Sequence, residues 1–230
     1  LPESLTPDMR KADTSRTWTQ QMKKMYVNSK NMLGEGSLAV IIWVAMLFTF
    51  GFTIMHAIFI LYTGMPVADG GLNFTEADNG RIFAMIGVTG IITQGFLIGP
   101  MTKKFGSRRL LTFAALLTGI GLVLIPYSQS EYAWLHILSV TCLLSIGSGL
   151  FQPSSSTLLA QFAKAEGYEL GVVMGANESL GAFARILGPI SGGVVWVLTS
   201  KGTYPWDYHT AFHLCGLLML CSALLSLRLS

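Results

Sequence analysis

Two charged residues lie within a long apolar stretch that is rich in glycine. Glu178 and Arg185 are seven residues apart between Leu170 and Leu198. In an α-helix this spacing is close to two turns, about 10.5 Å along the axis, and puts both side chains on one face. Burial favours a neutral carboxyl group, whereas a nearby guanidinium favours the ionised form. We therefore expect Glu178 to accept a proton or a substrate charge, with Arg185 as its partner.

The same spacing allows a second interpretation, in which the pair only holds its helix against a neighbouring helix. Further polar side chains interrupt other apolar stretches, where each must find a hydrogen-bond partner. His56 is the second candidate for proton coupling, because imidazole titrates near neutral pH. Gln94, Gln152 and Asn177 are candidates for the wall of a cavity.

The composition places these residues in a membrane protein. Of the 230 residues, 51% are hydrophobic and 12% are charged, and the mean hydropathy is +0.54. Soluble domains carry about 25% charged residues. An α-helix needs about 20 apolar residues to cross a bilayer, and the charge-free stretches are of that length or longer: 36–68, 82–102, 110–130, 132–163 and 208–227. The net charge of +3 is too small to indicate a nucleic-acid partner.

Residues 1–37 differ from the rest of the chain, because they are polar and contain no span. We expect them to form a cytoplasmic loop. Lys23, Lys24 and Lys30 lie beside apolar residues at near-helical spacing, which suggests a basic amphipathic helix at the membrane surface; these apolar residues are Trp18, Met22, Met25, Met32 and Leu33. A solvated linker is the alternative interpretation.

Residues 38–230 are expected to form an all-α bundle of six transmembrane helices. The predicted spans are about 38–62, 79–101, 109–128, 133–157, 170–198 and 209–227. A β-barrel would require strands that alternate polar and apolar residues, and no such alternation is present. Most Lys and Arg residues fall on one side of these spans, with Lys201 and Arg81 on the other. The side richer in basic residues is predicted to be cytoplasmic, and it carries both termini.

Small residues and prolines mark possible packing and gating positions. In the fifth span, glycines recur every three or four residues from Gly171 to Gly192, which predicts close helix packing on one face. Pro153 interrupts the fourth span and is followed by three serines. Proline kinks a helix, and nearby hydroxyl groups can satisfy the freed carbonyl groups. The kink fits a moving gate or a cavity wall, and a static kink fits it equally.

Four segments together resemble the major facilitator superfamily. Residues 95–109, GFLIGPMTKKFGSRR, are similar to its cytoplasmic loop signature, and residues 185–193, RILGPISGG, resemble the eleventh helix of its bacterial drug:proton antiporters. Residues 149–156, GLFQPSSS, resemble their tenth helix, and residues 1–5 resemble the exit of a sixth helix into the central loop. The resemblance covers the whole chain, in order.

The resemblance implies roles for individual residues. By analogy, Gly99 and Gly106 would form tight turns, with Arg108 and Arg109 as cytoplasmic anchors. The signature usually has an acid where Lys103 stands, at least in the first half of the family's proteins. Other gating or helix-packing candidates are Gly95, Pro153, Gly188, Pro189 and Gly192.

The resemblance also implies a function. The family's fold has two six-helix halves with alternating access to a central site, and this chain would be the second half. We expect a secondary active transporter, in which inward proton flow drives efflux of a small amphipathic compound; a sugar or metabolite facilitator without proton coupling is the alternative. An intramembrane enzyme or scaffold is a weaker alternative, since no nucleophile triad, metal cluster or phosphate-binding loop is recognisable.

The expected surroundings follow from that function. The partners would be the small-molecule substrate, protons, the lipid bilayer and an N-terminal six-helix half, or a second copy of this chain if it is truly half-size. The expected location is the bacterial inner membrane. We expect no cofactor and no metal ion.

Overall fold

The chain folds into long α-helices. The computed structural model describes residues 32–34, 36–128 and 131–229, and within these ranges there is no β-strand. The long helices are α3 (Ser37–Gly64), α4 (Glu76–Ile92), α5 (Ile98–Leu124), α6 (Ala133–Ala165), α7 (Leu170–Thr199) and α8 (Tyr208–Ser226). Shorter helical segments are η1 (Val67–Asp69), η2 (Thr93–Leu97) and η3 (Ile125–Tyr127). The all-α prediction is confirmed, whereas most of the predicted interfacial helix in residues 1–37 lies outside the described residues.

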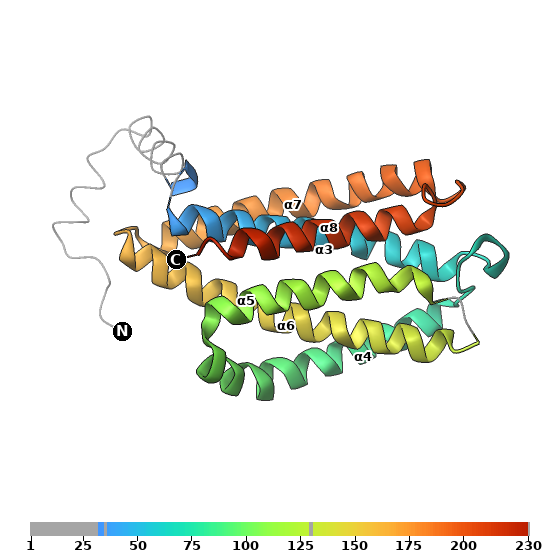
Figure 1. The fold of residues 1–230 in the computed structure, drawn as a ribbon, viewed down its shortest axis with the longest axis horizontal. Coiled ribbons are helices and arrows are strands. Elements are labelled where there is room, and N and C mark those ends of the chain that lie inside the picture. The colour runs from blue at the N-terminus through green and yellow to red at the C-terminus, as the bar shows by residue number, and fades with distance from the viewer. Residues whose placement is uncertain (1–31, 35, 129–130, 230) are drawn as a thin grey trace.

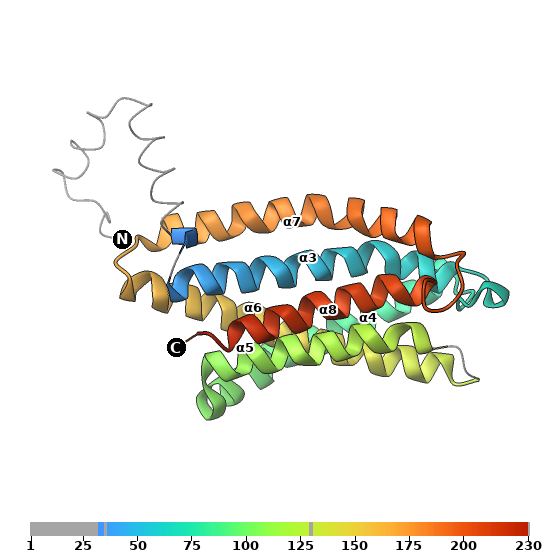
Figure 2. The ribbon, with the colours of Figure 1, turned by 45° about the horizontal axis from the view of Figure 1, so that its top comes forward.

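The helices lie side by side in one elongated bundle (Figures 1 and 2). α3 packs mainly against α7 and α8, and α5 packs mainly against α6 and α8. α4 rests chiefly on α6. α3, α5 and α8 therefore form the centre of the bundle, with α7 and α4 at its sides.

Within the described ranges, five helical segments are long and apolar enough to cross a membrane. The longest, Glu76–Tyr127, has 52 residues and contains both the second and the third predicted span. Its helical geometry breaks at Gly106, where φ is 77° and ψ is 155°. Glycine adopts this conformation without the steric cost that a Cβ brings. Figure 1 shows α4 and the labelled part of α5 running in opposite directions, so the chain reverses between them.

The reversal depends on one glycine rather than two. Gly99 has helical geometry within α5, so the expected tight turn at this residue is wrong. No atom of a described residue lies within 4 Å of a Cβ built on Gly95 or Gly99. In this chain neither glycine is therefore a point of close helix packing.

α5 and α8 approach each other closely at two glycines. A Cβ placed on Gly216 would lie 2.5 Å from Val123 Cγ2, and one placed on Gly119 would lie 3.1 Å from Met219 Cβ. Small residues let helix backbones come together where lipid provides no hydrophobic drive. On its other side, α8 is joined to α3 by the Ser222 hydroxyl, which donates to Val44 O at 3.0 Å. α8 is thus held between two helices.

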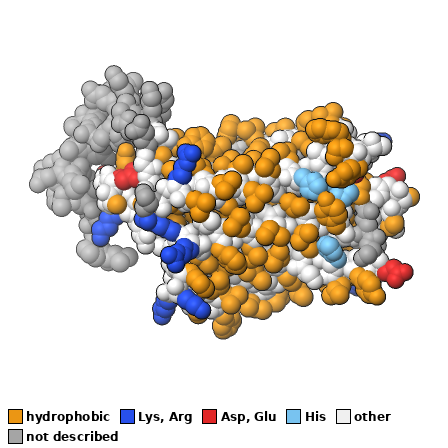
Figure 3. Space-filling view, in the orientation of Figure 1, with side chains coloured by type: hydrophobic (Ala, Val, Ile, Leu, Met, Phe, Trp, Pro, Cys, Tyr) orange, Lys and Arg blue, Asp and Glu red, His pale blue; other side chains and the backbone are white. Residues whose placement is uncertain are grey.

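The two ends of the bundle differ in charge. Figure 3 shows Lys and Arg side chains gathered at the end where α5 begins and α8 ends, with hydrophobic side chains covering the middle. Asp, Glu and His side chains are visible toward the opposite end. The capping box of α4, in which Asp78 Oδ2 accepts from Thr75 N at 3.0 Å, contributes one of the acids of that opposite end.

Candidate functional site: a polar groove between four helices

A groove with a volume of about 480 Å³ opens between α3, α4, α6 and α7. Polar and aromatic side chains from all four helices and from η2 form its wall: Phe48, Thr49, Phe52, Thr53, His56, Ile86, Gly90, Gln94, Ser145, Ser148, Gly149, Gln152 and Arg185. Arg185 is the one residue of this wall with a permanent charge. A groove of this size and character accommodates a small amphipathic molecule.

Four residues singled out by sequence meet in this groove. His56 comes from α3, Gln94 from η2, Gln152 from α6 and Arg185 from α7. They are separated by up to 129 residues in sequence, so only the fold brings them together. The other two candidates, Asn177 and Glu178, do not line the groove.

Glu178 reaches the groove through its partner. Arg185 Nη2 donates to Glu178 Oε2 at 3.3 Å, which confirms the geometry expected from their spacing. The arginine crosses the intervening turns because Gly181 lies between the two residues. A Cβ placed on Gly181 would lie 3.3 Å from Arg185 Nη1, tighter than ordinary contact. The lack of a side chain at Gly181 therefore gives the guanidinium room to lie along the helix.

The ion pair is open rather than enclosed. The Arg185 side chain is 51% exposed and the Glu178 side chain 70%. Its single contact of 3.3 Å is longer than a strong charge-assisted hydrogen bond, which measures about 2.7–2.9 Å. Such a pair costs little to separate, so either partner is available to another ligand.

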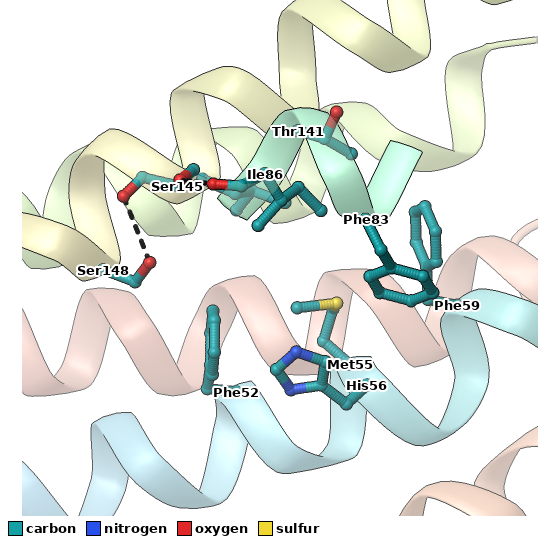
Figure 4. Close-up of a pocket in the computed structure, with 10 residues that line it drawn as sticks. Phe52, Met55, His56, Phe59, Phe83, Ile86, Thr141, Ser145 and Ser148 are labelled. Atoms are coloured by element: carbon teal, nitrogen blue, oxygen red, sulfur yellow. Dashed lines mark hydrogen bonds between the residues drawn. The ribbon is translucent and has the colours of Figure 1, made fainter. Parts of the chain in front are cut away.

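Aromatic rings form the apolar side of the site. Phe48 of α3 and Phe151 of α6 stack with ring centroids 3.6 Å apart. The His56 ring meets the edge of Phe52 at 4.6 Å. Figure 4 shows a small pocket beside the groove, where His56, Phe52 and Met55 of α3 lie opposite Ile86 of α4 and Ser145 of α6.

A π-helical turn places Gln94 in the groove. Residues Thr93–Leu97 form η2, which carries one residue more per turn than an α-helix and often occurs at functional sites. This turn rests on Gly149 of α6, where a Cβ would lie 3.1 Å from Thr93 Cγ2 and 3.9 Å from Gln94 Cγ. Thr93 is fully buried against α6, and Gln94 therefore faces the groove.

Hydroxyl groups of the groove wall were missed by the sequence analysis. Thr49 and Thr53 lie on α3, and Ser145 and Ser148 lie on α6. Their spacing could have identified them, because Thr49, Thr53 and His56 are three or four residues apart, which puts the two threonines on the same face of a helix as the candidate His56. One of the hydroxyls also joins two helices, since Ser145 Oγ donates to Ile86 O at 2.8 Å. The Thr53 hydroxyl lies closest to carbonyl groups of its own helix, at 2.9 Å from Thr49 O and 3.0 Å from Phe50 O.

The glycines of α7 divide into two groups. Gly188 packs directly against Thr53 of α3, and a Cβ on Gly192 would lie 3.2 Å from Ile54 Cγ2. At Gly171 and Gly175, no described atom lies within 4 Å of the position that a Cβ would occupy. The expected continuous packing face therefore covers only the second half of α7, around Pro189.

The first serine after Pro153 does not satisfy a freed carbonyl group, because the hydroxyl of buried Ser154 has no hydrogen-bond partner among the described residues. Among the described residues, no three His, Cys, Asp or Glu side chains form a cluster that could hold a metal ion.

The sequence matches a known family of membrane proteins. The sequence model of the Major Facilitator Superfamily matches residues 38–230. Multidrug resistance protein 2 of Bacillus subtilis is 26% identical over 171 residues, which are 74% of this chain and 38% of that protein. Multidrug resistance protein 1 of the same organism is 26% identical over 70% of this chain and 38% of its own length. The class G tetracycline resistance protein of Vibrio anguillarum is 26% identical over 58% of this chain and 32% of its own.

These relatives point to a transporter rather than to a catalytic enzyme. The chain spans 38% of the length of the two Bacillus subtilis proteins.

Proposed function

Because the chain belongs to the major facilitator superfamily, we propose that it is one half of a secondary active transporter and that the groove is half of its substrate path. The observation that carries this proposal is the position of Arg185, which lines the groove while pairing with Glu178 on its open side. The relatives named for multidrug and tetracycline resistance support a small amphipathic substrate.

The open side of the groove requires a protein cover. A charged side chain at the centre of a bilayer costs on the order of 2.5–3.5 kcal/mol even on lenient scales, so lipid is a poor neighbour for Glu178 and Arg185. A second six-helix bundle laid over the groove would cover the charges. The N-terminal half of a longer protein is the proposed occupant, and a second copy of this chain is the alternative.

Glu178 is proposed as the coupling carboxylate. When ionised it holds Arg185 at 3.3 Å, and when protonated it loses most of this attraction. The guanidinium, which already lines the groove, is then free to bind a substrate there instead of Glu178. Proton binding on one side of the membrane and release on the other would thus change the polarity of the substrate path. His56, on the neighbouring helix α3, is the secondary candidate for this role.

The proposed topology has six crossings. Both legs of Glu76–Tyr127, on either side of Gly106, would span the membrane. The end that carries Arg108 and Arg109 would be cytoplasmic, together with both termini, and the location would be the bacterial inner membrane.

The test is transport by the full-length protein in proteoliposomes, with and without a pH gradient. Fluorescent amphipathic dyes and tetracycline are suitable substrates for the first panel. We expect Glu178→Gln to abolish transport that depends on the gradient while leaving membrane insertion intact. Glu169→Gln is the matched control, because Glu169 is an exposed acid that precedes α7 and does not line the groove.

The outcomes separate the alternatives. Transport that is unchanged in Glu178→Gln argues for a structural ion pair. Wild-type transport that ignores the pH gradient favours a facilitator without proton coupling. No transport of any small molecule by the wild-type protein in a folded, inserted state would overturn the proposed function itself.

A further inference from the structure

A second pocket, whose lining shares no residue with the groove, lies at the basic end of the bundle. It has a volume of about 550 Å³ and is formed by three segments that the fold brings together: 105–112, 158–161 and 226–229. We call it the basic pocket, because Arg108 and Arg109 form part of its wall. It lies at the end where Figure 3 shows Lys and Arg side chains gathered.

The two arginines of the basic pocket have no carboxylate partner in the described part of the chain. The ion pairs there join Arg81 to Asp78, Arg185 to Glu178 and His209 to Asp207. Arg108 is positioned by an aromatic ring instead, with its guanidinium carbon 5.3 Å from the centroid of Phe162. Lys103 and Lys104 precede the pocket and add to its positive potential. The pocket therefore favours an anion.

The remaining wall of the basic pocket is largely apolar. Phe105 and Leu227 are 45% and 68% exposed, and Leu158 forms the inner side. The Thr112 and Ser226 hydroxyls lie 2.6 Å apart and join α5 to α8 beneath it. From here an exposed apolar surface continues along both helices, through Phe113 of α5 and Leu224 of α8. A ligand that used the whole site would have an anionic head and hydrocarbon chains.

We propose that the basic pocket binds the phosphate group of an anionic phospholipid, with the acyl chains along α5 and α8. Basic pockets between membrane helices at the cytoplasmic surface suit such head groups, and each Lys or Arg near an anionic membrane surface contributes about 1 kcal/mol. A free phosphate ion would use the arginines but not the exposed apolar surface. This inference concerns a face of the bundle away from the groove and does not depend on the transported substrate.

The test measures lipid retention by the full-length protein. Protein is purified in detergent with added phosphatidylglycerol or phosphatidylcholine, and bound lipid is counted by native mass spectrometry. We expect wild-type protein to retain phosphatidylglycerol in preference to phosphatidylcholine. Arg109→Gln should weaken that retention about fivefold, the equivalent of about 1 kcal/mol, and the double variant Arg108→Gln/Arg109→Gln should weaken it further.

Matched controls separate the pocket from general surface charge. Lys103→Gln/Lys104→Gln removes two neighbouring cations that do not line the pocket, and should weaken retention much less than Arg108→Gln/Arg109→Gln does. Inorganic phosphate in excess should not displace the lipid. Equal loss in both double variants, unchanged retention in the arginine variants, or displacement by inorganic phosphate would each overturn the proposal. If loss of the contact between Arg108 and Phe162 prevents folding of the double variant, Arg109→Gln alone decides.

Discussion

α7 and α8 look alike in sequence and differ in the structure. Both are apolar, both contain glycine and both lie against α3. α8 is held between α3 and α5 and contains no Asp, Glu, Lys or Arg within Tyr208–Ser226, whereas α7 packs mainly on α3 alone and carries Glu178 and Arg185. The comparison teaches two things. Glycine spacing indicates where a neighbouring helix can pack closely. Charged residues within an apolar helix indicate the side that faces a polar groove rather than another helix.

The largest expected effect is on the contact between α5 and α8. Gly216→Leu would force side-chain atoms into Val123, with Gly119 O only 3.3 Å from the new Cβ. Overpacking of a close contact costs about 1–3 kcal/mol or more, so we expect a large loss of monodisperse protein and of thermal stability. Gly80→Leu is the control, because no described atom lies within 4 Å of its Cβ position. Equal stability of the two variants would show that α8 is not closely packed.

The second prediction is that the exposed face of α7 contacts water, whereas the exposed face of α8 contacts lipid. Gly175 of α7 and Cys221 of α8 are both exposed in this chain. If α7 lines a water-filled path, Gly175→Cys should react readily with a membrane-impermeant charged maleimide in inverted or right-side-out vesicles. Cys221, facing hydrocarbon, should remain unlabelled, because a charged, membrane-impermeant reagent does not enter the apolar interior of the bilayer. Similar labelling at both positions would remove the distinction between the two helices.

The third prediction concerns the space that Gly181 leaves for Arg185. Gly181→Leu would displace the guanidinium from its position along α7 and separate it from Glu178. We expect transport to fall several-fold, with little loss of folded protein. Ala182→Leu adds the same bulk one residue further along, about 100° around the helix, on an exposed face. A transport rate in Gly181→Leu that equals the rate in Ala182→Leu would argue that the ion pair has no role in transport.

The smallest expected effect is the loss of one hydrogen bond between α8 and α3. Ser222→Ala removes the donor to Val44 O, and such bonds between membrane helices contribute on average about 0.6 kcal/mol. A small decrease in thermal stability is expected. Ser139→Ala should show none, since the Ser139 hydroxyl bonds only within its own helix, to Leu135 O at 2.7 Å. A larger effect at Ser139 than at Ser222 would contradict the assignment.

Much of the fold was predictable from hydropathy alone. Long charge-free stretches without strand-like alternation can satisfy their backbone groups in a bilayer as helices, and the described residues contain five such segments. The ion pair was also predictable, because Glu178 and Arg185 lie on a single helix and their spacing determines their separation. Local rules of this kind need no knowledge of tertiary contacts.

Features that depend on contacts between helices were not predictable. The spacing of Gly171 and Gly175 matches that of Gly188 and Gly192, yet only the second pair packs against α3. Gly99 and Gly106 both fit a turn, and the chain reverses only at Gly106. A glycine permits a close approach or a turn, and the neighbouring helix decides whether it is used.

The π turn at Thr93–Leu97 rotates the faces of the helix that follows it relative to those of the helix that precedes it. One additional residue in the turn rotates everything beyond it by about 100° relative to an uninterrupted α-helix. Before the turn, Gly90 faces Ser145 of α6, and beyond it Phe96 points outward with 74% of its surface exposed. Deletion of one residue from this turn would swing the segment that leads to Gly106 to another side of the bundle, and Gln94 would lose its place in the groove while the helix itself stayed intact.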